Sequence, residues 1–327
     1  MRAEPPVPRR GWRAALYAST GGRVNVGVAP AERAHQELLR RVRRPLVGSR
    51  HIAVASIKGG VGKTTVAACL GLMLAEYRGD GVVAVDADPD AGTLADRLAG
   101  GPPPRASGGT ATATAAGTAA TAAGRTAGTA SATVRDLLAD LESVGTLGDV
   151  GRYTALAGRL RVLAGEQDPA MGAAFRREEY LRVCTALARF FPIVITDSGT
   201  GLVHSAMRGT LELADRLIVV GTPTVDGASR ASKTLDWLLA HGHGDLVADA
   251  VLVLCQDRSS PKVDDRQLSR HFAQRCRHVV RIPADPHLYS GGRIDPDALR
   301  PATRDACLEL AAVIADGFAL STGAVAG

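Results

Sequence analysis

The chain has 327 residues and a formal net charge of +6, with 46% hydrophobic and 22% charged residues. This length is enough for one large domain with a sizeable core. The five cysteines are scattered and form no C-x-x-C pair, which argues against a zinc or iron–sulfur site. No apolar run approaches the ~18 residues that a membrane span needs, so we expect a cytoplasmic protein.

The first 48 residues form a basic extension. Eleven arginines and three glutamates give residues 1–50 a net charge of +8, which leaves −2 for the rest of the chain. A short amphipathic stretch surrounds Trp12, Leu16 and Tyr17. A helix is predicted over residues 31–44, and Pro45 ends it.

The arginines that crowd the end of this predicted helix have two interpretations. Either they stay solvated and complement the helix dipole, or they form a docking surface for an acidic partner, a membrane or nucleic acid. We expect residues 1–48 to dock a partner and to lie outside the core, because Trp12 and Tyr17 are typical of binding surfaces. Membrane-surface binding is not favoured, since Gly21 and Gly22 break a short apolar face.

Residues 56–65, SIKGGVGKTT, are the stretch around which the chain is organised. They lie between a predicted strand over residues 51–55 and a predicted buried helix over residues 66–77, which is the context of a phosphate-binding loop. The glycines allow backbone N–H groups to curl around an anion. Lys63 can reach the β- and γ-phosphates, and the Thr64 hydroxyl can bind Mg²⁺. Ile57 replaces the first Gly of the strict G-x-x-x-x-G-K-[ST] pattern.

Carboxylates follow two further apolar strands. Asp86 and Asp88 come at the end of the run 81–86, and Asp197 ends the run 191–196. A carboxylate after a buried strand is the arrangement that holds Mg²⁺ directly or through water, although many strands end with an Asp that caps the next helix. The phosphate-binding loop, the Asp86-Ala-Asp88 segment and Asp197 follow one another in this order along the chain, which favours the metal interpretation.

The remaining chain alternates strands and helices. Strands are predicted over 160–164, 193–196, 216–220, 250–254 and 279–282, and helices over 134–141, 176–190, 227–240, 263–272 and 302–318. This predicts an α/β fold with a mainly parallel, doubly wound sheet. Residues 49–321 form the predicted domain, interrupted by a low-complexity insertion over 100–133 that we expect to be disordered, and residues 322–327 form a tail.

The segment KGGVGKTT resembles the deviant Walker A loop of the MinD/ParA family of P-loop ATPases, and the resemblance covers about residues 49–320. It implies ATP and Mg²⁺ as cofactors and an ATP-dependent homodimer in which Lys58 reaches the partner's nucleotide. It also implies that Lys58, Lys63 and Asp88 are catalytic, with Asp88 orienting the attacking water, and that Thr64, Asp86 and Asp197 surround the metal. The implied nucleotide contacts are Lys58, Gly59, Gly60, Val61, Gly62, Lys63, Thr64, Thr65, Gln256, Pro283 and Asp285.

A narrower resemblance is to the MinD-like ATPases encoded with actinobacterial type VII (ESX) secretion systems. The segments that carry it include Gly11-Trp12, the Arg43-Arg44-Pro45 helix end, Leu94-Ala-Asp-Arg97, Asp197-Ser-Gly-Thr-Gly201, Arg208-Gly209, Asp226-Gly-Ala228 and Leu235-Asp-Trp237. One position departs from the pattern. The family has Asn after the strand at residues 251–254, where this chain has Cys255 and then Gln256, whose amide lies one position later.

We expect a Mg-dependent ATPase whose nucleotide state switches dimerisation and partner binding. Its partner would belong to a type VII secretion system and would bind residues 1–48. One alternative is a DNA-partitioning ATPase of the ParA type, for which arginines over 266–281 would supply a basic surface, although nearby aspartates dilute it. The other alternative is a nucleotide-binding scaffold with negligible turnover.

Overall fold

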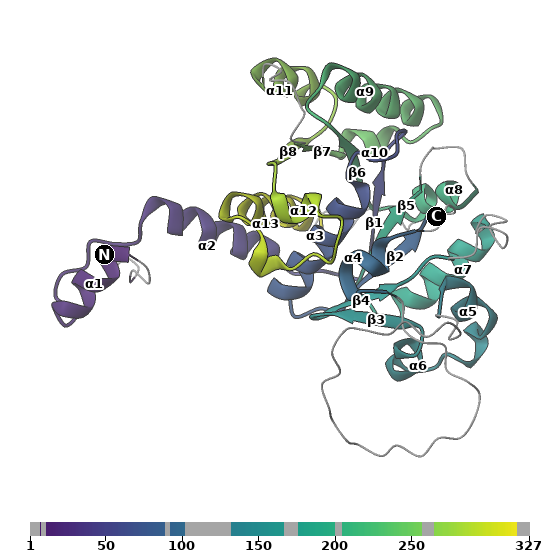
Figure 1. Cartoon of the computed structure of the whole chain (residues 1–327), viewed down its shortest axis with the longest axis horizontal. Helices are drawn as coiled ribbons and strands as arrows, with labels where there is room; N and C mark the ends of the chain where they lie inside the picture. Colours follow the sequence, from purple (N-terminus) through teal and green to yellow (C-terminus); the bar gives the residue numbers. More distant parts are fainter. Residues whose placement is uncertain are drawn as a thin grey trace.

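An eight-stranded sheet with the order β3-β4-β2-β5-β1-β6-β7-β8 forms the centre of the protein (Figure 1). The computed structural model describes residues 7, 11–88, 92–101, 132–166, 176–199, 205–256 and 265–318. The strands are β1 (Arg50–Ala55), β2 (Val82–Ala87), β3 (Thr154–Ala157), β4 (Leu160–Leu163), β5 (Ile193–Ser198), β6 (Arg216–Gly221), β7 (Val251–Cys255) and β8 (His278–Ile282). All pair in parallel except β3, which is antiparallel to β4. Every residue of β1, β2, β5 and β6 is buried, because helices cover both faces.

Two layers of helices cover the sheet (Figure 1). One layer holds α2 (Pro30–Val42), α3 (Lys63–Tyr77), α4 (Leu94–Ala99) and α13 (Pro301–Asp316). The other holds α5 (Val134–Ala139), α7 (Arg177–Ala188), α8 (Ser205–Leu213), α9 (Val225–Ala240), α10 (Gly244–Ala248) and α11 (Asp265–Ala273). The short helices α6 (Leu147–Gly151) and α12 (Pro286–Tyr289) lie in connections. The mainly parallel α/β fold expected from the sequence is confirmed.

Among the differences from the expectations, two concern the loop helix and the edge of the sheet. The loop helix α3 begins three residues early, at Lys63, because Gly62 adopts a left-handed conformation that turns the chain into the helix. The edge strand β3 was not predicted. It has four residues and leaves Leu156 exposed, so its apolar pattern is weak. Most of the insertion expected over 100–133 and the whole tail 322–327 lie outside the described residues.

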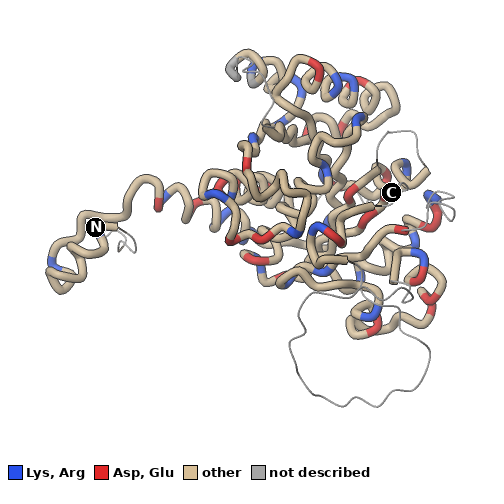
Figure 2. Tube along the Cα trace, in the orientation of Figure 1, with Lys and Arg blue, Asp and Glu red and all other residues tan. Residues whose placement is uncertain are grey.

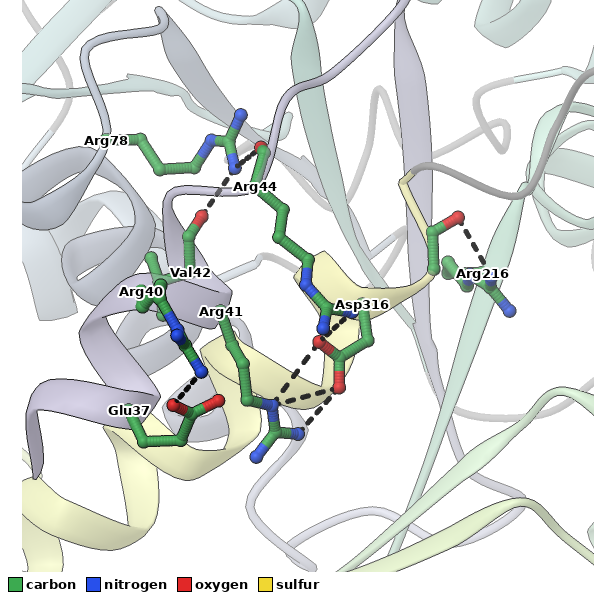
Figure 3. A network of polar contacts seen from close by, with 9 residues as sticks. Glu37, Arg40, Arg41, Val42, Arg44, Arg78, Arg216 and Asp316 are labelled. Atoms are coloured by element: carbon green, nitrogen blue, oxygen red, sulfur yellow. Dashed lines mark hydrogen bonds and ion pairs between the residues drawn. The ribbon is translucent and has the colours of Figure 1, made fainter. Parts of the chain in front are cut away.

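The helix α2 packs along α13, and the expectation that residues 1–48 lie wholly outside the core is wrong for this helix. Val42 is completely buried in the same core cluster as α3. Arg41 and Arg44 both bind the carboxylate of Asp316, at 2.7 and 2.8 Å (Figure 3). Arg41 is therefore turned to a partner in the fold, whereas Arg40 and Arg44 remain largely exposed to solvent.

Buried arginines fasten this region at the amino end of the sheet. Arg78 donates to the carbonyl oxygens of Val42 and Arg44, and Arg216 donates to that of Gly317 at 2.9 Å (Figure 3). Both side chains are almost fully buried, 4% and 7% exposed. A Cβ on Gly317 would lie 2.0 Å from Arg216 Nε, so the contact requires glycine there. The arginines thus tie α2 and the end of α13 to the sheet.

The helix α1 (Gly11–Ser19) projects away from the sheet (Figure 1). None of its residues is buried, and Trp12 is 66% exposed. The guanidinium of Arg13 donates to the Val28 carbonyl at 3.2 Å, which folds α1 back onto the segment leading into α2. Charged residues are sparse on α1 and dense where α2 meets the body (Figure 2). Within the part of the chain that the structure describes, no helix is long and apolar enough to cross a membrane.

Candidate functional site

The loop between β1 and α3 is shaped by two glycines. Gly60 and Gly62 have φ values of 74° and 99°, which favour glycine. A Cβ on Gly62 would also lie 3.2 Å from Cys255 Sγ, so β7 approaches the loop closely. The helix α3 starts directly after Gly62, and its unpaired N–H groups and its dipole favour an anion at the loop.

Lys63 lies at the base of this loop and is only 6% exposed. Burial lowers the pKa of its ammonium group, whereas the charges of Asp197 and Asp88 act in the opposite direction. The expected catalytic residues Lys63 and Asp88 are therefore close enough to interact. A buried ammonium beside carboxylates is poised to compensate a further anion.

Asp86 and Asp197 are direct neighbours on the paired strands β2 and β5. Both are almost fully buried, at 1% and 2% exposed. Burial raises the pKa of Asp86 to about 7 and that of Asp197 to about 8, and the charge of Asp86 contributes to the rise at Asp197. Like charges buried together are costly unless a cation joins them.

The two carboxylates differ in their partners. Asp86 accepts hydrogen bonds from the backbone N–H groups of Leu94 at 3.0 Å and Asp88 at 3.1 Å. Asp197 is hydrogen-bonded to the Thr64 side chain, but its Oδ1 is buried with no hydrogen-bond partner among the described residues. Thus the structure brings together Thr64, Asp86 and Asp197, and leaves one carboxylate oxygen open to a ligand.

This arrangement fits a small hard cation that takes its other ligands from phosphate and water. In the described ranges no cluster of three or more His, Cys, Asp or Glu side chains could hold a metal by itself. A Mg²⁺ site that depends on one or two carboxylates, a hydroxyl and a bound phosphate does not need such a cluster.

A cavity of about 230 Å³ opens beside the loop. It is lined by Gly60, Val61, Gly62, Thr65, Thr222, Cys255, Gln256, Ile282, Pro283, Asp285, Leu288 and Tyr289. The residues expected at the nucleotide base therefore line the same cavity as the phosphate loop. A concave, mostly apolar cavity with a few polar groups is typical of a small-molecule site.

Two of these residues also have structural partners. The Asp285 carboxylate accepts hydrogen bonds from the backbone N–H groups of His287 and Arg300, both at 2.9 Å, and so caps α12. The Gln256 carbonyl accepts a hydrogen bond from the Tyr289 hydroxyl at 2.8 Å. The Gln256 side chain is exposed at the cavity rim.

Lys58 does not line this cavity. Its ammonium group is 3.4 Å from Asp226 Oδ2, and half of its side chain is exposed. Its carbonyl accepts a hydrogen bond from the Ser56 hydroxyl at 2.6 Å, which holds the start of the loop. The structure therefore separates the two loop lysines, with Lys63 buried at the base and Lys58 at the surface.

The sequence analysis assigned no role to Arg97, a buried arginine of α4. Its guanidinium donates to the Thr65 hydroxyl at 3.1 Å and to the Leu288 carbonyl at 3.2 Å. Arg97 therefore links the loop helix to the base side of the cavity. The segment Leu94-Ala-Asp-Arg97 contributed to the resemblance to the ESX-associated ATPases. An arginine on a short helix does not by itself predict which residues it contacts.

Comparison with known proteins agrees with this geometry. The family described as "CobQ/CobB/MinD/ParA nucleotide binding domain" matches residues 52–300. The chain is 36% identical over 316 residues to "ESX-1 secretion-associated protein EspI" of Mycobacterium tuberculosis, covering 95% of this chain and 43% of that protein. The chain thus spans less than half the length of the curated relatives it matches.

Solved structures share the fold. A ParA family ATPase from Chlorobium tepidum has a TM-score of 0.61 at 17% identity, covering 81% of this chain and 98% of that chain. MinD from Pyrococcus horikoshii, solved with Mg-ADP, has a TM-score of 0.57 at 20% identity, covering 80% and 94%. With the glycine loop, the buried lysine and the paired carboxylates in place, the chain belongs to the CobQ/CobB/MinD/ParA nucleotide-binding family.

Proposed function

We propose that the protein is a Mg-dependent ATPase that dimerises on ATP and regulates a partner assembly in type VII secretion. The observation that carries the proposal is the buried Asp197 oxygen that has no hydrogen-bond partner among the described residues and lies beside Thr64 and Lys63 at the phosphate loop. A protein retains such a buried charge mainly where a ligand satisfies it.

The loop, through Gly59 to Thr65, would hold the phosphates, and Lys63 would neutralise their charge. Thr64, Asp197 and Asp86 would hold Mg²⁺, which supplies charge stabilisation for phosphoryl transfer when it is bound. Asp88 would orient the attacking water. Gln256, Pro283 and Asp285 would border the adenine at the far side of the cavity. The Mg-ADP complex of the similar MinD fold supports this choice of ligand.

Lys58 would act across the dimer. Its side chain is half exposed and lies outside its own cavity, which suits a group that serves a second protomer. An extra cation supplied in trans contributes on the order of 10³–10⁵ in the rate of related GTPases. In a single-turnover ATPase assay, Lys58→Ala should retain most nucleotide binding and lose turnover. Equal turnover by both proteins would contradict the role, and no turnover by either would favour the scaffold alternative.

The partner contact is proposed to involve the exposed helix α1, because α2 is fixed to the body. Trp12 on α1 and the nearby Val24 and Val26 are exposed, at 66%, 42% and 42%. The similarity to EspI supports a secretion component as the partner. In a binding assay with purified cytosolic components of a type VII apparatus, Trp12→Ala should weaken binding. Trp237→Phe is the control, because it removes the other tryptophan, which lies on α9 and packs against the core.

DNA partitioning is the weaker alternative. Arg275 is paired with Asp236, and Arg277 is paired with Asp249 at 2.8 Å, so these two charges are compensated within the protein. A salt-dependent affinity for random-sequence DNA, with a steep slope, would favour this alternative over the proposed function.

A further inference from the structure

Asp226 is the carboxylate that holds Lys58 in the free protomer. Its Oδ2 is 3.4 Å from Lys58 Nζ, and within the described chain it is the one acidic group in ion-pair range of that lysine. Both its oxygens also accept hydrogen bonds from Arg230 Nε, at 3.0 and 2.9 Å. Arg230 keeps the pKa of Asp226 below its ordinary value, so the carboxylate is ionised at neutral pH.

The fold places Asp226 beside the loop by a close helix approach. Asp226 lies in the first turn of α9, where the helix dipole favours a carboxylate. The next residue must be small, because a Cβ on Gly227 would lie 2.1 Å from the Thr222 hydroxyl and 2.4 Å from the Thr222 carbonyl oxygen. Thr222 itself lines the cavity. The Asp226-Gly227 pair therefore places a carboxylate beside Lys58, at the start of the phosphate loop.

We propose that Asp226 is a positioning residue that holds Lys58 in the free protomer and releases it to the phosphates of a second protomer's nucleotide. This inference rests on the proposed dimer role of Lys58. Both side chains are at least half exposed, so the ion pair is weak and exchange with a more highly charged triphosphate is reversible. The strength of the pair sets how readily the dimer forms.

The test compares nucleotide-dependent dimerisation of variants by sedimentation equilibrium with Mg²⁺ and a non-hydrolysed ATP analogue. Asp226→Asn should tighten the dimer by about two- to fivefold, the range that a weak exposed ion pair allows. Asp226→Glu keeps the charge and should behave as the wild type. Asp236→Asn is the matched control, because Asp236 is an exposed, ion-paired aspartate further along the same helix. An unchanged or weaker dimer in Asp226→Asn would overturn the inference.

A second readout does not depend on the dimer. Nucleotide-free protein is treated briefly with an N-hydroxysuccinimide ester, and acylation of Lys58 is quantified by peptide mass spectrometry. Lys58 should react faster in Asp226→Asn than in the wild type or in Asp236→Asn, and equal rates would overturn the inference. If the wild type shows no nucleotide-dependent dimer while Asp226→Asn accelerates acylation, the pair is real but the proposed function and the exchange both fail.

Discussion

The two ends of the mainly parallel sheet differ in how their buried charged side chains are hydrogen-bonded. At the carboxyl end, Asp86 and Asp197 are buried side by side, and one oxygen of Asp197 lacks a hydrogen-bond partner among the described residues. At the amino end, the buried Arg78 and Arg216 donate to backbone carbonyl groups and to nearby aspartates. A charge that is satisfied internally stabilises a fold, whereas an open oxygen of a buried carboxylate beside an anion-binding loop is a candidate place for a ligand. We therefore infer that the buried charges at the amino end stabilise the fold and that those at the carboxyl end bind a ligand.

Among single substitutions, the largest expected effect comes from removing a satisfied charge at the amino end. Arg78→Ala leaves the carbonyl groups of Val42 and Arg44 and the Asp80 carboxylate without their donor, and should lower the free energy of unfolding by about 3 kcal/mol. Denaturant unfolding measures the change, with the exposed Arg182→Ala as control. A loss of less than ~1 kcal/mol, within the range of ordinary substitutions, would break the comparison.

The pH dependence of the free energy of unfolding should reflect the raised pKa values of the carboxylates at the carboxyl end of the sheet. The pKa values of Asp86 and Asp197 in the folded chain, about 7 and about 8, lie above the unfolded values. The folded state therefore holds protons that the unfolded state releases, and stability should fall as pH rises from about 4 to about 8. Each such group contributes about 1.4 kcal/mol per pH unit inside its window. Unfolding of the nucleotide-free protein at pH 5, 6.5 and 8 tests the sign against the Asp86→Asn, Asp197→Asn double variant, which should lose this dependence.

A single substitution at the carboxyl end of the sheet should raise stability while weakening nucleotide binding. Asp197→Asn removes a buried carboxylate whose ionised form is disfavoured by burial and by the charge of Asp86, although the charge of Lys63 opposes both. It should raise the free energy of unfolding at pH 8 by roughly 1–3 kcal/mol while weakening Mg-dependent nucleotide binding. A variant that loses stability and retains Mg-dependent nucleotide binding would mean that Asp197 stabilises the fold and does not bind the ligand.

The smallest effect is expected at the α2 anchor. Asp316 is half-buried and shared by Arg41 and Arg44, so Asp316→Asn should cost about 1 kcal/mol in unfolding free energy, more than an exposed pair and less than Arg78. Glu37→Gln, which breaks the exposed pair with Arg40 on the same helix, is the matched control. Equal small effects would mean that the ion pairs with Asp316 do not help to hold α2.

The sequence predicted most of the carboxyl end because its features are local. The glycine loop, Lys63 and the carboxylates after β2 and β5 are recognisable from spacing, and parallel pairing then brings Asp86 opposite Asp197. The contacts of Arg97 with Thr65 and of Asp226 with Lys58 join residues far apart in the chain, so no periodicity reveals them.

The amino end was less predictable for the same reason. The arginines of α2 were interpreted through the net charge of their segment, which suggested a separate docking element. The partner of Arg41 is Asp316, which lies 275 residues away at the end of α13. Composition thus described the charge of the extension correctly but not its environment, and α1 remains the exposed part of it.

The most direct test of the central claim is equilibrium binding of ATP to wild type and Lys63→Ala, measured by isothermal titration calorimetry with and without Mg²⁺. The account predicts Mg-dependent binding to the wild type and its loss in Lys63→Ala, with circular dichroism showing that the variant is folded. Retained ATP affinity in a folded Lys63→Ala variant would contradict the assignment of the carboxyl end of the sheet as the nucleotide site.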